Sequence, residues 1–112
     1  MLTTIDRAEL VSALATDSLT LVEALPEAHF RSEHLPGAVN LPGELTAELA
    51  ATIAPDRSRT VVVYCSGPAC GRSRVAAAAF TRLGYRDVRV YAGGKAEWFG
   101  AGLPMEHVAT AG

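Results

Sequence analysis

The spacing of apolar residues changes along this chain, and these changes predict short strands between helices. Leu10, Val11 and Leu14 recur at helical spacing, and Asp6 followed by Glu9 has the spacing of a capping box. A helix is therefore predicted over about 7–15. Four short apolar runs read as buried strands, at residues 19–22, 38–41, 61–64 and 88–91.

Turn signals and composition predict the remaining helices. Pro26 suits the first position of a short helix that continues through Arg31. Further helices are expected at 43–53, stopped by Pro55, at 72–83, ended by Gly84, and around Trp98 after a pair of glycines. Strands that alternate with helices predict a three-layer α/β fold, with a central parallel sheet of about five strands flanked by helices.

Length and charge narrow the possible classes of protein. The 112 residues, 49% hydrophobic, suit a single domain over 1–112 with its core at about 5–105. The net charge is -2 with no basic block, so we expect no nucleic-acid partner. No apolar run approaches the roughly 18 residues of a membrane helix, and no membrane partner is expected. The first residues do not resemble a secretory signal, which makes the cytoplasm the default compartment.

The clearest strand, 61–64, leads directly into a loop of small residues with both cysteines of the chain. The loop and the start of the next helix read Cys65-Ser66-Gly67-Pro68-Ala69-Cys70-Gly71-Arg72-Ser73. Ligands of open parallel sheets bind beyond the carboxyl ends of strands, where the next helix offers unpaired N–H groups. Such a cradle binds anions and stabilises a thiolate, the nucleophilic form of cysteine. Gly67 and Gly71 suit a backbone that curls so that several N–H groups converge. The alternative is that Cys65 is simply a core residue at a strand end.

The order of several short motifs resembles a rhodanese-like domain of the single-domain sulfurtransferase type, over about 5–105. The matching segments are Leu21-Val-Glu23, Pro26 to Pro42, the strand ending at Cys65, Ala79 to Tyr85, Val88 to Trp98, and Ala101-Gly-Leu-Pro104. The resemblance implies that Cys65 takes a sulfane sulfur from a donor such as thiosulfate and holds it as a persulfide. A thiol, cyanide or an acceptor protein then removes the sulfur, and no cofactor is needed.

The same resemblance assigns binding of the persulfide or the donor to the loop N–H groups. These belong to Ser66, Gly67, Ala69, Cys70, Gly71, Arg72 and Ser73. The loop is similar to a variant group with a C-x-G-P-x-C sequence, about two residues longer than the commonest form. Leu25 replaces an arginine that commonly follows the first core strand, and Glu33 replaces a glycine before His34.

Residues near the loop have open roles. Cys70 could attack a Cys65 persulfide to form a disulfide, or could merely fill the loop. Glu23 could act as a base or could brace the loop, and His34 is expected to be structural. Two cysteines five positions apart lack further ligands, so no metal is expected.

Two other functions use the same thiolate chemistry. A cysteine phosphatase or arsenate reductase needs an arginine at the position that Gly71 holds, where its guanidinium clamps phosphate oxygens. A non-enzymatic redox module would need only Cys65 and Cys70. The physiological donor and acceptor stay open.

Overall fold

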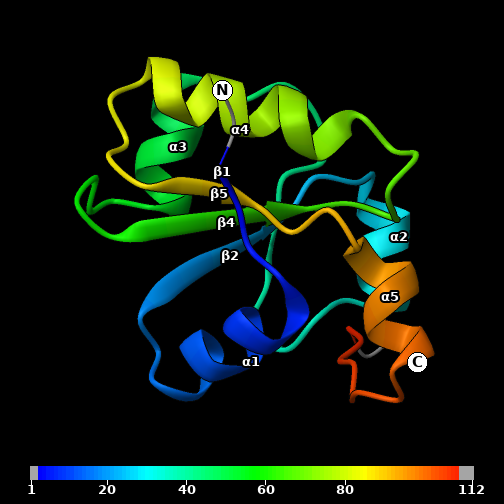
Figure 1. Cartoon of the computed structure of the whole chain (residues 1–112). Coiled ribbons are helices and arrows are strands. Elements are labelled where there is room, and N and C mark those ends of the chain that lie inside the picture. The colour runs from blue at the N-terminus through cyan, green and yellow to red at the C-terminus, as the bar shows by residue number, and fades with distance from the viewer. Residues whose placement is uncertain (1–2, 109–112) are drawn as a thin grey trace.

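Five parallel strands form one sheet, and helices cover both of its faces (Figure 1). The computed structural model describes residues 3–108. The strands are β1 (Thr3–Thr4), β2 (Leu19–Glu23), β3 (Val39–Asn40), β4 (Thr60–Tyr64) and β5 (Val88–Val90), in the spatial order β1-β5-β4-β2-β3. The helices are α1 (Arg7–Ala15), α2 (Glu27–Ser32), α3 (Ala47–Ile53), α4 (Arg72–Arg82) and α5 (Gly94–Gly100). The predicted three-layer α/β fold is confirmed.

Alternation along the central strand β4 divides the core into two layers. Val61 and Val63 face one side and pack with side chains of α3 and α4. Val62 and Tyr64 face the other side and pack with α1 and with Trp98 of α5. Because successive side chains of a strand point to opposite faces, a strand covered on both sides must be apolar throughout.

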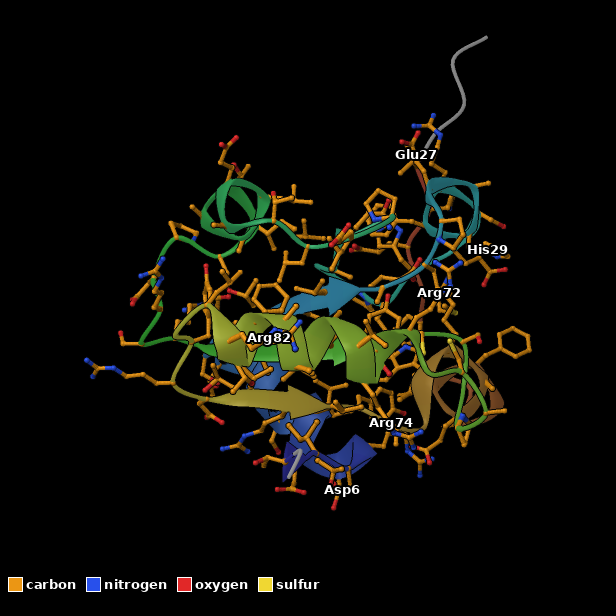
Figure 2. The ribbon with its side chains drawn as sticks, turned by 90° about the horizontal axis from the view of Figure 1, so that it is seen from above. Asp6, Glu27, His29, Arg72, Arg74 and Arg82 are labelled. Carbon is orange, nitrogen blue, oxygen red and sulfur yellow. The ribbon has the colours of Figure 1, made fainter. Side chains whose placement is uncertain are left out.

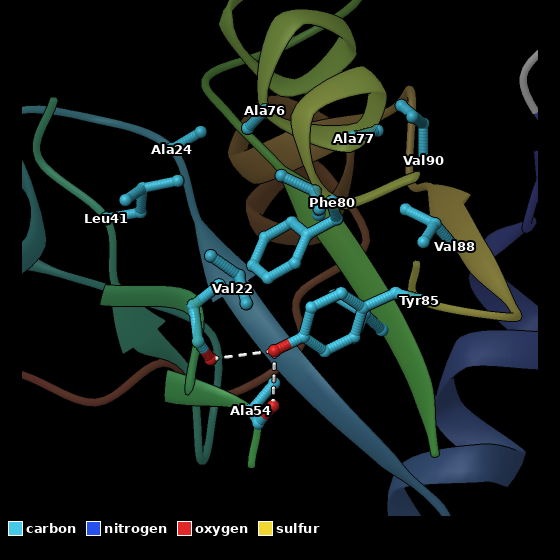
Figure 3. Packing of buried hydrophobic residues seen from close by; sticks show 13 residues of the cluster. Val22, Ala24, Leu41, Ala54, Ala76, Ala77, Phe80, Tyr85, Val88 and Val90 are labelled. Atoms are coloured by element: carbon cyan, nitrogen blue, oxygen red, sulfur yellow. Dashed lines mark hydrogen bonds between the residues drawn. The ribbon is translucent and has the colours of Figure 1, made fainter. Parts of the chain in front are cut away.

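The core layer between the sheet and helices α3 and α4 contains an aromatic pair (Figure 3). The rings of Phe80 and Tyr85 meet edge to face, with centroids 5.1 Å apart. The buried Tyr85 hydroxyl donates to the carbonyl oxygens of Ala50, at 2.9 Å, and Ala54, at 2.6 Å. These bonds tie the C-terminal end of α3 to the chain segment after α4.

Several predicted boundaries were wrong by a few residues. The helix expected at 43–53 begins only at Ala47, because Thr46 caps it by accepting a hydrogen bond from the Leu49 N–H at 3.1 Å. Pro26 is the cap of α2 rather than its first residue. The strands expected at 38–41 and 88–91 are shorter, as β3 and β5. Strand β1 was missed, since two exposed threonines carry no apolar signal.

Candidate active site

Cys65 follows the last residue of β4, at the carboxyl end of the sheet's middle strand. Its side chain is buried, with the residue only 1% exposed. The sulfur lies 3.3 Å from Oγ of Ser73, in the first turn of α4, and 3.4 Å from the carbonyl oxygen of Cys70. The start of α4 therefore supplies a hydroxyl directly to this sulfur, and Ser73 is itself buried.

Backbone hydrogen bonds from the first turn of α5 hold the loop in place. The N–H of Lys95 donates to the carbonyl of Cys65 at 3.0 Å, and the N–H of Ala96 donates to that of Ser66 at 2.9 Å. Gly94 has a φ of +61°, and a Cβ there would lie 2.5 Å from the Cys65 carbonyl oxygen. Only glycine fits this close approach of two backbones.

The glycines of the loop itself do not use the conformational freedom that was predicted for them. Gly67 and Gly71 were expected to give the backbone freedom to curl. Neither is among the described residues with positive φ, and a Cβ at either position would meet at most an ordinary contact. The position that requires glycine is Gly94, in another segment of the chain.

A turn brings Cys70 back against Cys65. The Cys70 N–H donates to the Gly67 carbonyl at 3.1 Å. The Cys65 sulfur lies 3.4 Å from the Cys70 carbonyl oxygen, and both cysteines are free, with Cys70 half-buried. The loop thus places Cys70 in contact with Cys65.

The pKa values of the two thiols are shifted in opposite directions. Burial raises the pKa of Cys65, its hydrogen bond to Cys70 raises it further, and the N–H and hydroxyl of Ser73 oppose the rise. Burial would also raise the pKa of Cys70, but hydrogen bonds from Cys65, Arg72 and Ser66 outweigh it and lower the value from 9.0 to about 7. Burial therefore opposes the thiolate that was expected at Cys65, whereas the N–H and hydroxyl of Ser73 favour it, and the nucleophilic role of Cys65 stays a prediction.

The predicted binding residues fall into two groups. Ser66, Cys70, Arg72 and Ser73 contribute N–H groups, hydroxyls or a thiol around the two sulfurs. Gly67 supplies the carbonyl that fixes the turn, while Ala69 and Gly71 are exposed. The Gly71 carbonyl accepts the Val75 N–H at 3.2 Å, inside the first turn of α4.

A buried charge pair lies next to the loop and was only partly anticipated. Glu23, at the end of β2, is fully buried and 3.0 Å from Nζ of Lys95, which also donates to the His29 carbonyl at 3.0 Å. The Tyr64 hydroxyl donates to Glu23 at 2.8 Å and accepts the Leu35 N–H at 3.0 Å. These contacts favour the bracing role of Glu23. Only the acid at the end of an apolar strand signalled this network, and nothing in the sequence indicated Lys95 or Tyr64.

His34 is engaged away from the loop. Its ring stacks on Phe30 with centroids 3.9 Å apart, and its Nδ1 lies 2.8 Å from the Phe30 carbonyl oxygen. Its Nε2 lies 3.7 Å from a carboxylate oxygen of Glu106. These contacts agree with the structural role expected for this histidine.

Two hollows adjoin the loop. One groove runs beside α4 and includes Gly71 and Arg72 at its loop end, with mainly apolar walls from Ala24, Leu41, Leu45, Val75 and Ala79. The other is lined by Ser66 of the loop and by Lys95 and the exposed Phe99 of α5. Arg72 and Arg74 stand at the loop end of α4, whereas Arg82 stands at the far end (Figure 2). Within residues 3–108, every helix is too short or too polar to span a bilayer.

The rhodanese-like domain family model matches residues 6–101, nearly the whole chain. The chain belongs to this family. The rhodanese-like domain is 34% identical to the HTH-type transcriptional regulator Rv0324 of Mycobacterium tuberculosis, over 96% of this chain and 46% of the regulator. It is 39% identical to thiosulfate sulfurtransferase PspE of Escherichia coli, over 57% of this chain and 59% of that enzyme. The chain thus spans about half the length of these relatives.

Solved structures share the fold. The BH2092 protein from Bacillus halodurans superposes with a TM-score of 0.85 at 24% identity, covering 94% of this chain and 77% of that one. A thiosulfate sulfurtransferase from Pseudomonas aeruginosa gives a TM-score of 0.75 at 25% identity, covering 97% of this chain and 21% of that enzyme. The predicted family is confirmed, while the longer variant loop stays a prediction.

Proposed function

We propose that this rhodanese-like domain is a sulfurtransferase that carries a sulfane sulfur as a persulfide on Cys65. The observation that supports it best is the position of the Cys65 sulfur, at the end of β4 and against the hydroxyl and N–H of Ser73. Two similar proteins bear the name thiosulfate sulfurtransferase. The family and this geometry together favour sulfur chemistry at that atom.

In the proposed reaction, the Cys65 thiolate attacks the outer sulfur of thiosulfate. A sulfur–sulfur bond forms to Cys65, and the donor's own sulfur–sulfur bond breaks with sulfite as the leaving group. Burial raises the pKa of Cys65, whereas the N–H and hydroxyl of Ser73 oppose the rise and so favour the attacking thiolate. A thiophilic acceptor, which is a small thiol, cyanide or an acceptor protein, then removes the outer sulfur.

The surroundings of the loop suit an anionic donor. Arg72 lines the groove at the loop, and Arg74 also belongs to the first turn of α4, so both would attract a dianion such as thiosulfate toward this end of the helix. The groove beside α4 is mainly apolar and has a volume of about 700 Å³, much more than thiosulfate fills. We assign that extra space to the acceptor. A reducing compartment such as the cytoplasm would keep both thiols free.

The test of this function is the intact mass of the reduced protein after incubation with thiosulfate. Cys70→Ser should gain the mass of one sulfur atom and release one sulfite. Cys65→Ser should gain nothing. If neither thiosulfate nor an inorganic polysulfide adds sulfur to Cys70→Ser, the sulfurtransferase proposal fails.

A redox-sensing module is the second candidate, because a 34% identical relative is named a transcriptional regulator and Cys65 contacts Cys70. An assay of Cys70→Ser with thiosulfate and excess cyanide distinguishes the two, because this variant cannot form the Cys65–Cys70 disulfide. Repeated formation of thiocyanate supports the enzyme, whereas the absence of repeated turnover supports the sensor. The phosphatase alternative is disfavoured, since Gly71 occupies the position where an arginine would clamp phosphate.

A further inference from the structure

Cys70 lies in the loop against Cys65, whose sulfur is 3.4 Å from the Cys70 carbonyl oxygen. Burial raises the pKa of the Cys70 thiol, but hydrogen bonds from Cys65, the Arg72 N–H and Ser66 outweigh it and lower that pKa. An N–H cradle of this kind stabilises negative charge, and here a residue of the chain itself supplies that charge. The arrangement favours a chemical role for Cys70 over the alternative that it merely fills the loop.

The position of Cys70 against Cys65 determines which sulfur the Cys70 thiol can attack. The inner sulfur, Sγ of Cys65, lies 3.4 Å from the Cys70 carbonyl oxygen, so the two cysteines are in contact across the loop. The turn closed by the Cys70 N–H and the Gly67 carbonyl holds Cys70 there, and the α5 contacts to Cys65 and Ser66 fix the other side of the loop. A disulfide requires sulfurs about 2.05 Å apart, so its formation needs only the side chains of two residues that already touch to turn toward each other.

We infer that Cys70 is a built-in resolving thiol that attacks the Cys65 persulfide and releases its outer sulfur as sulfide. This inference rests on the proposed persulfide of Cys65. The Cys70 thiolate attacks Sγ of Cys65, a Cys65–Cys70 bond forms, and the bond from Cys65 to the outer sulfur breaks. The outer sulfur leaves as hydrosulfide with the bonding electron pair, so it is reduced while the two cysteines are oxidised to a disulfide. A small-molecule dithiol then restores both thiols.

The acidity and exposure of Cys70 suit this role. The pKa of its thiol is lowered to about 7, because the hydrogen bonds of the cradle outweigh the effect of burial. A thiol attacks a sulfur–sulfur bond most effectively when its pKa is near the ambient pH. Cys70 is also half-buried where Cys65 is nearly inaccessible, so a reductant would reach the disulfide from its side. The domain would then have a second activity, the reduction of thiosulfate to sulfite and sulfide.

The experiment mixes fully reduced protein with excess thiosulfate and no added thiol, and measures sulfite, sulfide and intact mass. Wild type should release one sulfite and one sulfide per chain and lose two hydrogens, with a Cys65–Cys70 disulfide found by non-reducing peptide mapping. Cys70→Ser should release sulfite, keep the added sulfur and release no sulfide. Cys65→Ser should do neither. An inorganic polysulfide serves as a second donor, scored by mass and peptide mapping.

The outcomes separate the inference from the function on which it rests. If wild type keeps the added sulfur and releases no sulfide, as Cys70→Ser does, the resolving role is overturned and the sulfurtransferase stands. If Cys70→Ser gains no sulfur from either donor, the persulfide itself is absent and both ideas fail. Cys70→Ala is a second variant that guards against a folding defect or a residual hydrogen bond from serine. It should behave as Cys70→Ser does.

Discussion

Lys95 uses its backbone and its side chain for two different tasks at one site. Its N–H donates to the Cys65 carbonyl at 3.0 Å, while its Nζ lies 3.0 Å from a carboxylate oxygen of the fully buried Glu23. The other oxygen of that carboxylate, Oε2, has no hydrogen-bond partner within residues 3–108. The charge of Glu23 therefore depends on Lys95 and on the hydroxyl of Tyr64.

The first prediction concerns this charge pair. Lys95→Met keeps most of the length of the side chain but leaves the Glu23 carboxylate buried without its cation. Breaking a buried pair in this way should lower the free energy of unfolding by about 3 kcal/mol, measured by urea denaturation. The double variant Lys95→Met/Glu23→Gln removes both charges and should recover much of the loss. A double variant as unstable as the sum of the two single variants would show that the pair is not coupled.

The local patterns were sufficient to predict the fold. Helix α1 matches its predicted bounds, because Asp6 and Glu9 form the expected capping box with bonds of 2.8 Å and 3.3 Å. The short, apolar strands β2 and β4 were equally clear. By contrast, β1 is polar and only two residues long, and it pairs with β5 through contacts distant in sequence. No local pattern could indicate it.

The position of the site was predictable, but its electrostatics were not. A cysteine at the carboxyl end of a parallel strand, before a helix, indicated the loop. Which thiol the N–H groups face depends on the turn from Gly67 to Cys70 and on the approach of Gly94, whose partners are remote in sequence. The sequence therefore indicated the cradle, whereas the direction in which each thiol's pKa is shifted depends on contacts that only the fold brings together.

Ser73 is predicted to assist the attack by Cys65. Its hydroxyl lies 3.3 Å from the Cys65 sulfur and, with its N–H, lowers the pKa of that thiol against the effect of burial. Ser73→Ala should slow persulfide formation from thiosulfate by up to about tenfold, the equivalent of one lost hydrogen bond. Thr81→Ala is the control on the same helix, because the Thr81 hydroxyl donates only to the Ala77 carbonyl. Equal rates for the two variants would remove Ser73 from the site.

Arg72 is predicted to assist capture of an anionic donor. It lines the groove at the loop and is exposed, so its positive charge should attract an anionic donor to the entrance of the site. Arg72→Gln should raise the KM for thiosulfate several-fold, with little change in kcat, and the difference should shrink as salt is added. The control Arg86→Gln removes an equal charge just before the amino end of β5, at the end of the sheet away from the loop. This variant should leave KM unchanged. Equal effects of the two variants would mean that only net charge matters.

The acidity of Cys70 predicts a pH-dependent reactivity. The groups that face its sulfur are the Cys65 thiol, the Arg72 N–H and the N–H and hydroxyl of Ser66, and together they lower its pKa to about 7 despite burial. The rate of Cys70 alkylation by iodoacetamide should therefore reach half its maximum near pH 7. Cys65→Ala removes one donor and should raise that midpoint toward 9.0. An unchanged midpoint would show that the cradle N–H groups suffice without Cys65.

The same pKa predicts how stability depends on pH. Because the folded pKa of Cys70 lies below its ordinary value of 9.0, the unfolded chain binds more protons between pH 7 and pH 9. The contribution of Cys70 is therefore fully present above about pH 9, falls as the pH drops through that window, and is absent below about pH 7. Cys65, whose pKa is raised by burial, acts in the opposite direction and only above its ordinary value. Urea denaturation across the window should show wild type gaining stability with pH relative to Cys70→Ser, and parallel curves would contradict a Cys70 thiolate in the folded protein.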